Sequence, residues 1–177
     1  MEGVVNTIFI CVLVSMLVSF ASHPSINLPM LLGKSSDGSF PIWSIIMFSP
    51  YLYFVRFFSA LRRLCSGEAP TASESLYVGG WPSSPDKLPP GNPAIIDCTA
   101  ELPRVCWSDQ SYLCVPTWDT RSPHPSQIES AVKWASRKRD QNRPVFVHCA
   151  YGIFLSNNLS LCYMFYFYQT TLCQSFD

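Results

Sequence analysis

One stretch in the last third of the chain limits the possible folds most. Residues 144–152 read Pro-Val-Phe-Val-His-Cys-Ala-Tyr-Gly, an apolar run that leads into a cysteine and a glycine. A short apolar run that ends in a loop is typical of a buried central strand in a parallel sheet. Ligands of open α/β sheets bind beyond the carboxyl ends of the strands, and Cys149 stands at that end. A thiol there, beside His148 and a loop of backbone N–H groups, indicates a nucleophile next to an anion site.

Alternating strand and helix patterns precede this run. Four short apolar runs predict strands: residues 75–80, 94–98, 112–116 and 145–148. The first run ends in glycines, and we expect it at an edge of the sheet. A helix is predicted between the last two strands, where Ser126 and Glu129 form a capping box after Pro125 and apolar residues follow at helical spacing. These patterns predict an α/β fold with three layers and a mainly parallel central sheet.

The N-terminal residues 4–21 form one continuous apolar run. Its length suits a bilayer core, which takes about 20 apolar residues. A signal peptide is the alternative interpretation. The residues before the run include Glu2 and no Lys or Arg, and the run exceeds the about 7–15 residues usual for a signal peptide. We therefore expect an uncleaved membrane anchor.

A second apolar and aromatic segment covers residues 41–61, and it contains Pro50 and Arg56. Two interpretations fit it equally well: a second membrane span, or an aromatic-rich amphipathic segment that lies in the membrane interface. Arg62 and Arg63 follow directly. Because basic residues favour the cytoplasmic side of a membrane span, we expect a membrane protein whose downstream domain faces the cytoplasm.

Composition divides the chain into four parts: a membrane-anchoring region (1–64), a linker rich in Ser, Gly, Ala and Pro (65–74), a partial α/β domain (75–152) and an aromatic tail (153–177). Lys and Arg together number 12, as do Asp and Glu, so the charge gives no case for nucleic acid as a partner. The eight cysteines include no Cys-x-x-Cys pair and no zinc-like spacing. We expect most of them to be reduced, buried thiols.

Residues 147–152 resemble the signature of the cysteine-dependent protein tyrosine phosphatases, His-Cys-x5-Arg-Ser/Thr, and look most like the dual-specificity branch. His148, Cys149 and Gly152 match that signature, and Ser156 stands at its final Ser or Thr position. The resemblance covers residues 75–152 and is closest to membrane-anchored plant members of the branch. It implies a phosphatase-like domain that is incomplete at its C-terminal side.

The resemblance also implies the chemistry. Members of the family hydrolyse phosphate esters of tyrosine, serine and threonine through a phosphocysteine intermediate and need no metal or organic cofactor. Cys149 takes the place of the nucleophile, Asp119 that of the general acid, and His148 that of a residue that supports the loop and the thiolate. The phosphate-binding loop corresponds to Ala150, Tyr151, Gly152, the arginine position at Leu155, and Ser156. Asp97, within a predicted strand, is expected to have a structural role. The expected partner is a phosphorylated protein, with a phospholipid as the second possibility.

The sequence departs from the family at Leu155, where the signature requires arginine, and no Lys or Arg occurs from Ala150 to the C-terminus. The missing guanidinium would hold two phosphate oxygens at once. In other enzymes, removing one hydrogen-bond donor that stabilises the transition state lowers the catalytic rate roughly 10²–10³-fold. We therefore expect a truncated phosphatase with impaired activity. The alternatives are a membrane-bound regulatory or binding protein without catalysis, and a phosphoinositide or other lipid phosphatase.

Overall fold

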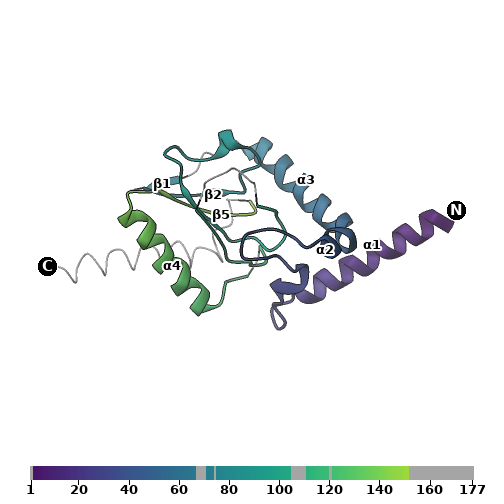
Figure 1. Cartoon of the computed structure of the whole chain (residues 1–177). Helices are drawn as coiled ribbons and strands as arrows, with labels where there is room; N and C mark the ends of the chain where they lie inside the picture. The colour runs from purple at the N-terminus through teal and green to yellow at the C-terminus, as the bar shows by residue number, and fades with distance from the viewer. Residues whose placement is uncertain (1, 67–70, 74, 105–110, 120, 152–177) are drawn as a thin grey trace.

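A sheet with strand order β1–β2–β5–β3–β4 lies at the centre of the protein (Figure 1). The computed structural model describes residues 2–66, 71–73, 75–104, 111–119 and 121–151. Within these residues the strands are β1 (Thr71–Ser73), β2 (Leu76–Gly80), β3 (Ala94–Asp97), β4 (Tyr112–Cys114) and β5 (Val145–Cys149). β1 runs antiparallel to β2, and the other four strands are parallel to one another.

β5 is the central strand, as the sequence predicted. It pairs with β2 on one side and β3 on the other, so that Val147 stands between Val78 and Ile96. Every residue of β5 is buried, which explains why this strand is a continuous apolar run. The expectation that residues 75–80 form an edge strand was wrong, because β1 pairs along the outer side of β2.

Helix α4 (Pro125–Asp140) covers one face of the sheet, at the position predicted. Its buried side chains pack against Ile96, Val145 and Val147 in one apolar cluster: Ile128, Ala131, Val132 and Ala135. These residues recur at helical spacing, as expected for a helix with one buried face.

The capping box of α4 lies two residues earlier than predicted. The His124 side chain accepts a hydrogen bond from the backbone N–H of Ser126, and the Gln127 side chain accepts one from the backbone N–H of His124. Pro125 occupies the first helical position, where its fixed φ and missing N–H are tolerated, so the residue before it becomes the cap. Glu129 instead pairs with Lys133 on the exposed surface.

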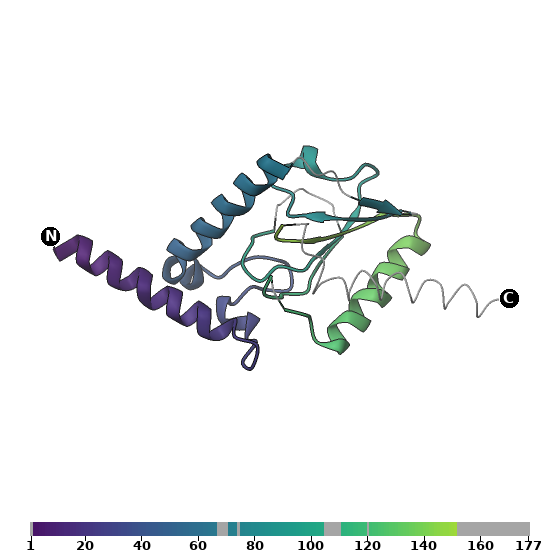
Figure 2. The same cartoon turned by 180° about the vertical axis from the view of Figure 1, so that it is seen from behind.

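Three helices precede the sheet: α1 (Glu2–Ala21), α2 (Ile42–Met47) and α3 (Ser49–Ser66). α3 and α4 lie on opposite sides of the sheet, which completes the three predicted layers (Figures 1 and 2). Val55 of α3 packs against Leu102 and Ala150, in the loops that follow β3 and β5. The N-terminal region is therefore packed directly against the α/β domain.

One helix among the described residues, Gly3–Ala21, is long and apolar enough to cross a membrane. Its C-terminal half packs against the protein through Val14, Val18 and Ala21, and its N-terminal half projects from the body (Figure 2). The second predicted segment, residues 41–61, instead forms α2 and most of α3, and neither meets the criteria for a span. The interfacial interpretation of that segment stays a prediction.

The expected linker, residues 65–74, contains regular structure. α3 continues to Ser66, and β1 is formed by Thr71–Ser73. A short polar strand such as β1 has no apolar pattern of its own, and it is stabilised by its pairing with β2. The predicted tail, residues 153–177, lies outside the described residues.

Candidate active site

Cys149 lies at the carboxyl end of β5, opposite Gly80 of β2. It is 6% exposed, and Cys98 and Cys114 are buried as well. Hydrogen bonds to both neighbouring segments fix the backbone around it. The Cys98 N–H donates to the His148 carbonyl at 2.9 Å, and the Trp81 N–H donates to the Ala150 carbonyl at 3.4 Å. The nucleophile expected from the sequence is therefore held in a rigid position at the strand end.

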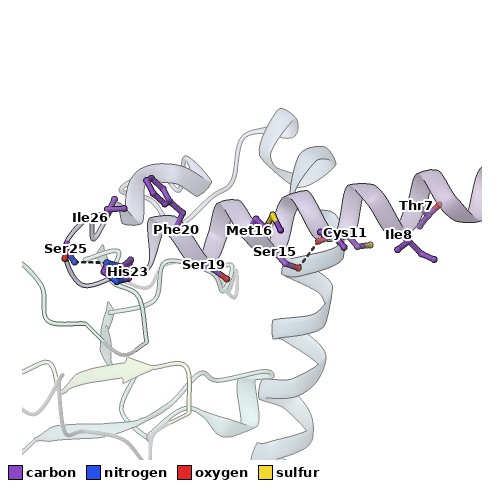
Figure 3. Close-up of a pocket in the computed structure, with 11 residues that line it drawn as sticks. Thr7, Ile8, Cys11, Ser15, Met16, Ser19, Phe20, His23, Ser25 and Ile26 are labelled. Carbon is purple, nitrogen blue, oxygen red and sulfur yellow. Dashed lines mark hydrogen bonds between the residues drawn. The ribbon is translucent and has the colours of Figure 1, made fainter.

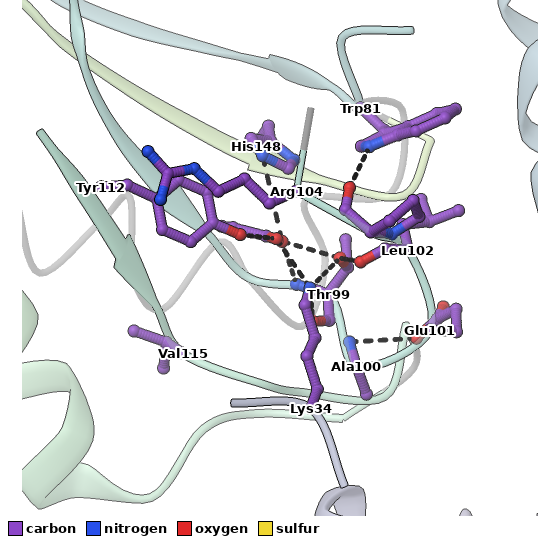
Figure 4. A network of polar contacts seen from close by, with 12 residues as sticks. Lys34, Trp81, Thr99, Ala100, Glu101, Leu102, Arg104, Tyr112, Val115 and His148 are labelled. Carbon is purple, nitrogen blue, oxygen red and sulfur yellow. Dashed lines mark hydrogen bonds and ion pairs between the residues drawn. The ribbon is translucent and has the colours of Figure 1, made fainter. Parts of the chain in front are cut away.

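A buried polar network stands beside this strand end (Figure 4). At its centre is Asp97, the last residue of β3, which is fully buried. The Lys34 ammonium lies 2.7 Å from its Oδ2, and the Tyr112 hydroxyl donates to the same oxygen. The N–H and the hydroxyl of Thr99 donate to Oδ1 at 2.8 and 2.7 Å. His148 Nε2 lies 3.9 Å from the same Oδ1.

The charge of Asp97 depends on these partners. Burial by itself would raise the pKa of Asp97, but the positive charges of Lys34 and His148 and the hydrogen bonds to the carboxylate outweigh it and hold the pKa at about 2. Asp97 is therefore ionised at neutral pH and joins Lys34 to the end of the sheet, in agreement with the structural role expected for it. Lys34 was not identified from the sequence, because a single lysine in a polar loop carries no signal of burial.

A cavity of about 420 Å³ opens between the loops that follow β3, β4 and β5 and the helices α1 and α3. Its lining combines carboxyl, aromatic, hydroxyl and aliphatic side chains: Ser15, Val18, Ser19, Ser22, Tyr51, Phe54, Val55, Glu101, Trp118, Asp119 and Tyr151. The cavity lies at the carboxyl ends of the parallel strands, where α/β folds bind their ligands. Tyr151 and Asp119 share it, so the loop that follows Cys149 meets the loop of the expected general acid.

Two carboxyl groups in this cavity have raised pKa values. Burial, together with the negative charge of Asp119, raises the pKa of Glu101 to about 7. Burial also raises the pKa of Asp119, against the opposing charge of Arg62. A raised pKa keeps a carboxyl group protonated to a higher pH, which suits it to donate that proton. The sequence did not predict a role for Glu101, because its burial depends on segments that are distant in the chain.

Helix α3 contacts the loop after Cys149 at Tyr151. The Phe58 ring lies edge-on to the Tyr151 ring with 5.7 Å between their centroids, and the Arg62 guanidinium carbon lies 5.1 Å from the centroid of the Tyr151 ring. A cation is therefore close to the loop that follows the cysteine.

The structure thus places five of the predicted site residues, namely Asp119, His148, Cys149, Ala150 and Tyr151. All five belong to the loops and strand ends at one edge of the sheet, and Ala150 is buried against Leu102 and Val55. Cys149 is not among the residues that line the cavity. Gly152, Leu155 and Ser156 lie outside the described residues, so their roles stay predictions.

A second cavity, of about 980 Å³, lies along α1 and the turn that follows it, between Thr7 and Ile26 (Figure 3). It is lined by apolar and small polar side chains of this one segment, including Ile8, Met16 and Phe20. It includes no residue of the sheet or its loops.

In the described part of the chain, no group of three or more His, Cys, Asp or Glu side chains is arranged to hold a metal ion.

Comparisons with known proteins find a distant likeness among solved structures. No family model matches the chain, and no curated protein matches it. Among solved structures it is similar to a protein from Shewanella putrefaciens CN-32 that is provisionally named a phosphatase (DUF442), with 14% identity and a TM-score of 0.42. The match covers 59% of this chain and 71% of that one. At this level of similarity the match identifies neither the family nor the chemistry of this chain.

Proposed function

We propose that this protein is a membrane-bound phosphatase of the cysteine-dependent, dual-specificity type, with low activity in this chain. The observation that carries the proposal is the position of Cys149 at the carboxyl end of the central strand, next to a loop whose Tyr151 shares a cavity with Asp119. The substrate class is a phosphorylated tyrosine, serine or threonine side chain of a protein. In this proposal helix α1 anchors the chain in the membrane and the domain faces the cytoplasm.

In the proposed reaction the Cys149 thiolate attacks the phosphorus atom of the monoester. The bond between phosphorus and the ester oxygen breaks, and Asp119 donates its proton to the leaving oxygen. Water then attacks the phosphocysteine, and the Asp119 carboxylate takes up a proton from that water. Inorganic phosphate leaves, and the thiolate is regenerated. The raised pKa of Asp119 keeps it protonated to a higher pH than an exposed aspartate.

A specific observation favours a second candidate function. Leu155 stands where the family has the arginine that clamps the phosphate, and the Cys149 side chain is almost completely buried. A domain that keeps the fold but lacks the clamp would bind or regulate other membrane components without turnover. The two functions differ in one measurable property, which is phosphate release that depends on Cys149.

The test is hydrolysis of para-nitrophenyl phosphate by the full chain in detergent micelles, beside the variants Cys149→Ser and Leu155→Arg. The full chain is required because Lys34 and α3 pack into the site. We expect weak release by the parent, none by Cys149→Ser, and release increased roughly 10²–10³-fold by Leu155→Arg. Release that survives Cys149→Ser would refute a cysteine mechanism. If neither the parent nor Leu155→Arg releases phosphate, and both samples have a native near-UV circular dichroism spectrum, the non-catalytic function is favoured.

A further inference from the structure

Helices α2 and α3 expose an unusual amount of apolar surface. Eight large apolar or aromatic side chains on these two helices are between 46% and 77% exposed: Ile42, Trp43, Ile46, Met47, Tyr53, Phe54, Phe57 and Leu61. We call this set the aromatic face. Soluble monomers rarely expose contiguous apolar patches of this kind without a binding partner.

The side chains of the aromatic face are not the ones that pack α3 against the rest of the protein. α3 already buries Leu52, Val55 and Ser59 against the rest of the molecule. The exposed residues Phe54 and Phe57 lie on the other side of the same helix, and the Phe54 ring stacks on Phe58 with 6.2 Å between centroids. A helix that is apolar on both sides needs a non-aqueous contact on its outer side.

Charge indicates what that contact is. Residues 38–67 contain no Asp or Glu. The guanidinium carbon of Arg56 lies 5.6 Å from the centroid of the Tyr53 ring, which belongs to the aromatic face. An amphipathic segment that combines aromatic side chains with basic residues binds the interface of membranes with anionic lipids.

The position of the aromatic face agrees with a membrane. α1, α2 and α3 lie together at one end of the molecule, away from α4 (Figures 1 and 2). α1 is the helix that is long and apolar enough to cross a bilayer, and α3 packs against its C-terminal half through Leu52. A bilayer that α1 enters is therefore close to α2 and α3 as well.

We propose that the aromatic face binds the interfacial layer of an anionic phospholipid membrane, beside the point where α1 enters it. Tyr51, Phe54 and Val55 of α3, together with Ser15 to Ser22 of α1, also line the cavity that holds Glu101 and Asp119. The cavity is then positioned at the membrane surface. This inference concerns a lipid-binding surface, and it holds or fails independently of the phosphatase chemistry proposed above.

The test uses the fluorescence of Trp43, which lies in the aromatic face and is 53% exposed. The full chain is reconstituted into vesicles of phosphatidylglycerol and phosphatidylcholine, in which the phosphatidylcholine acyl chains carry bromine, a short-range quencher. The parent is compared with Trp43→Phe and with the matched control Trp134→Phe, on α4 at the far side of the sheet. Both substitutions keep an aromatic ring, so both variants should fold.

We expect strong quenching in the parent, loss of most of it in Trp43→Phe, and no loss in Trp134→Phe. We also expect weaker quenching when the phosphatidylglycerol is replaced by unbrominated phosphatidylcholine, which keeps the fraction of brominated lipid the same. Quenching that is unchanged by Trp43→Phe would overturn the proposal. Equal quenching in the two kinds of vesicle would overturn the assignment to anionic lipid. Absence of quenching together with a dimer in micelles would assign the aromatic face to a second copy of the chain instead.

Discussion

Replacing Glu101 with glutamine should change how stability depends on pH. Glu101 is fully buried, and its pKa rises from 4.5 to about 7 because of burial and the charge of Asp119. In the unfolded chain the same carboxyl ionises near 4.5. Between these two values the folded state holds more protons than the unfolded state. The contribution of Glu101 to stability is therefore fully present below about pH 4.5 and is lost as pH rises towards 7.

The magnitude follows from the size of the shift. Each pKa unit corresponds to about 1.4 kcal/mol, so a shift from 4.5 to about 7 makes ionisation of Glu101 cost the folded state about 3 kcal/mol at pH 8. The variant Glu101→Gln has no charge to bury. Relative to the parent, it should become more stable by about 2–3 kcal/mol as pH rises from 5 to 8.

The assay is urea unfolding of the full chain in a non-ionic detergent, followed by tryptophan fluorescence at pH 5, 6, 7 and 8. The control is Glu129→Gln, on the exposed surface of α4, where the carboxyl is paired with Lys133 and its pKa is lowered, not raised. A difference between Glu101→Gln and the parent that stays constant over this pH range would refute the reasoning, because it would mean that Glu101 does not titrate within it.

Three further substitutions test the packing of the fold. Lys34→Met leaves the buried charge of Asp97 without its closest cation. We expect the free energy of unfolding, measured with urea, to fall by about 3–5 kcal/mol. A variant as stable as the parent would contradict the importance of this ion pair. Phe146→Ala removes a completely buried ring from β5, and a decrease of about 3–5 kcal/mol is expected in the same assay. Gln127→Ala removes the side chain that accepts a hydrogen bond from the His124 N–H. We expect the free energy of unfolding to fall by about 1 kcal/mol, with an unchanged far-UV circular dichroism spectrum. A much larger decrease would mean that the side chain has another role.

The central part of the fold was predictable because its signals are local. Residues 145–148 form a short, mostly apolar run that is typical of a strand buried on both faces, and the spacing of Ile128, Ala131 and Ala135 is typical of a helix with one buried side. The structure confirms both. The cap of α4 was misplaced because Ser126 and Glu129 match the capping-box pattern Ser/Thr-x-x-Glu/Gln. The true pair, His124 and Gln127, has the same spacing but begins with a histidine.

The elements that the sequence did not reveal depend on partners far away in the chain. β1 is a three-residue polar strand that exists through its pairing with β2. The burial of Lys34 results from Asp97 and Thr99, more than sixty residues later. Glu101 is buried in a cavity that α1 and α3 help to form. The roles of Cys149 and Asp119 stay predictions, because a fold places side chains without showing what they react with.

The contact of Lys34 with Asp97 also fixes how α1 is joined to the sheet. A flexible linker would let the sheet change its orientation relative to α1 freely. Here the segment that follows α1 ends in a buried ion pair at the carboxyl end of β3. In the membrane-bound protein that we propose, the sheet and its cavity would therefore keep one distance and one orientation relative to the membrane.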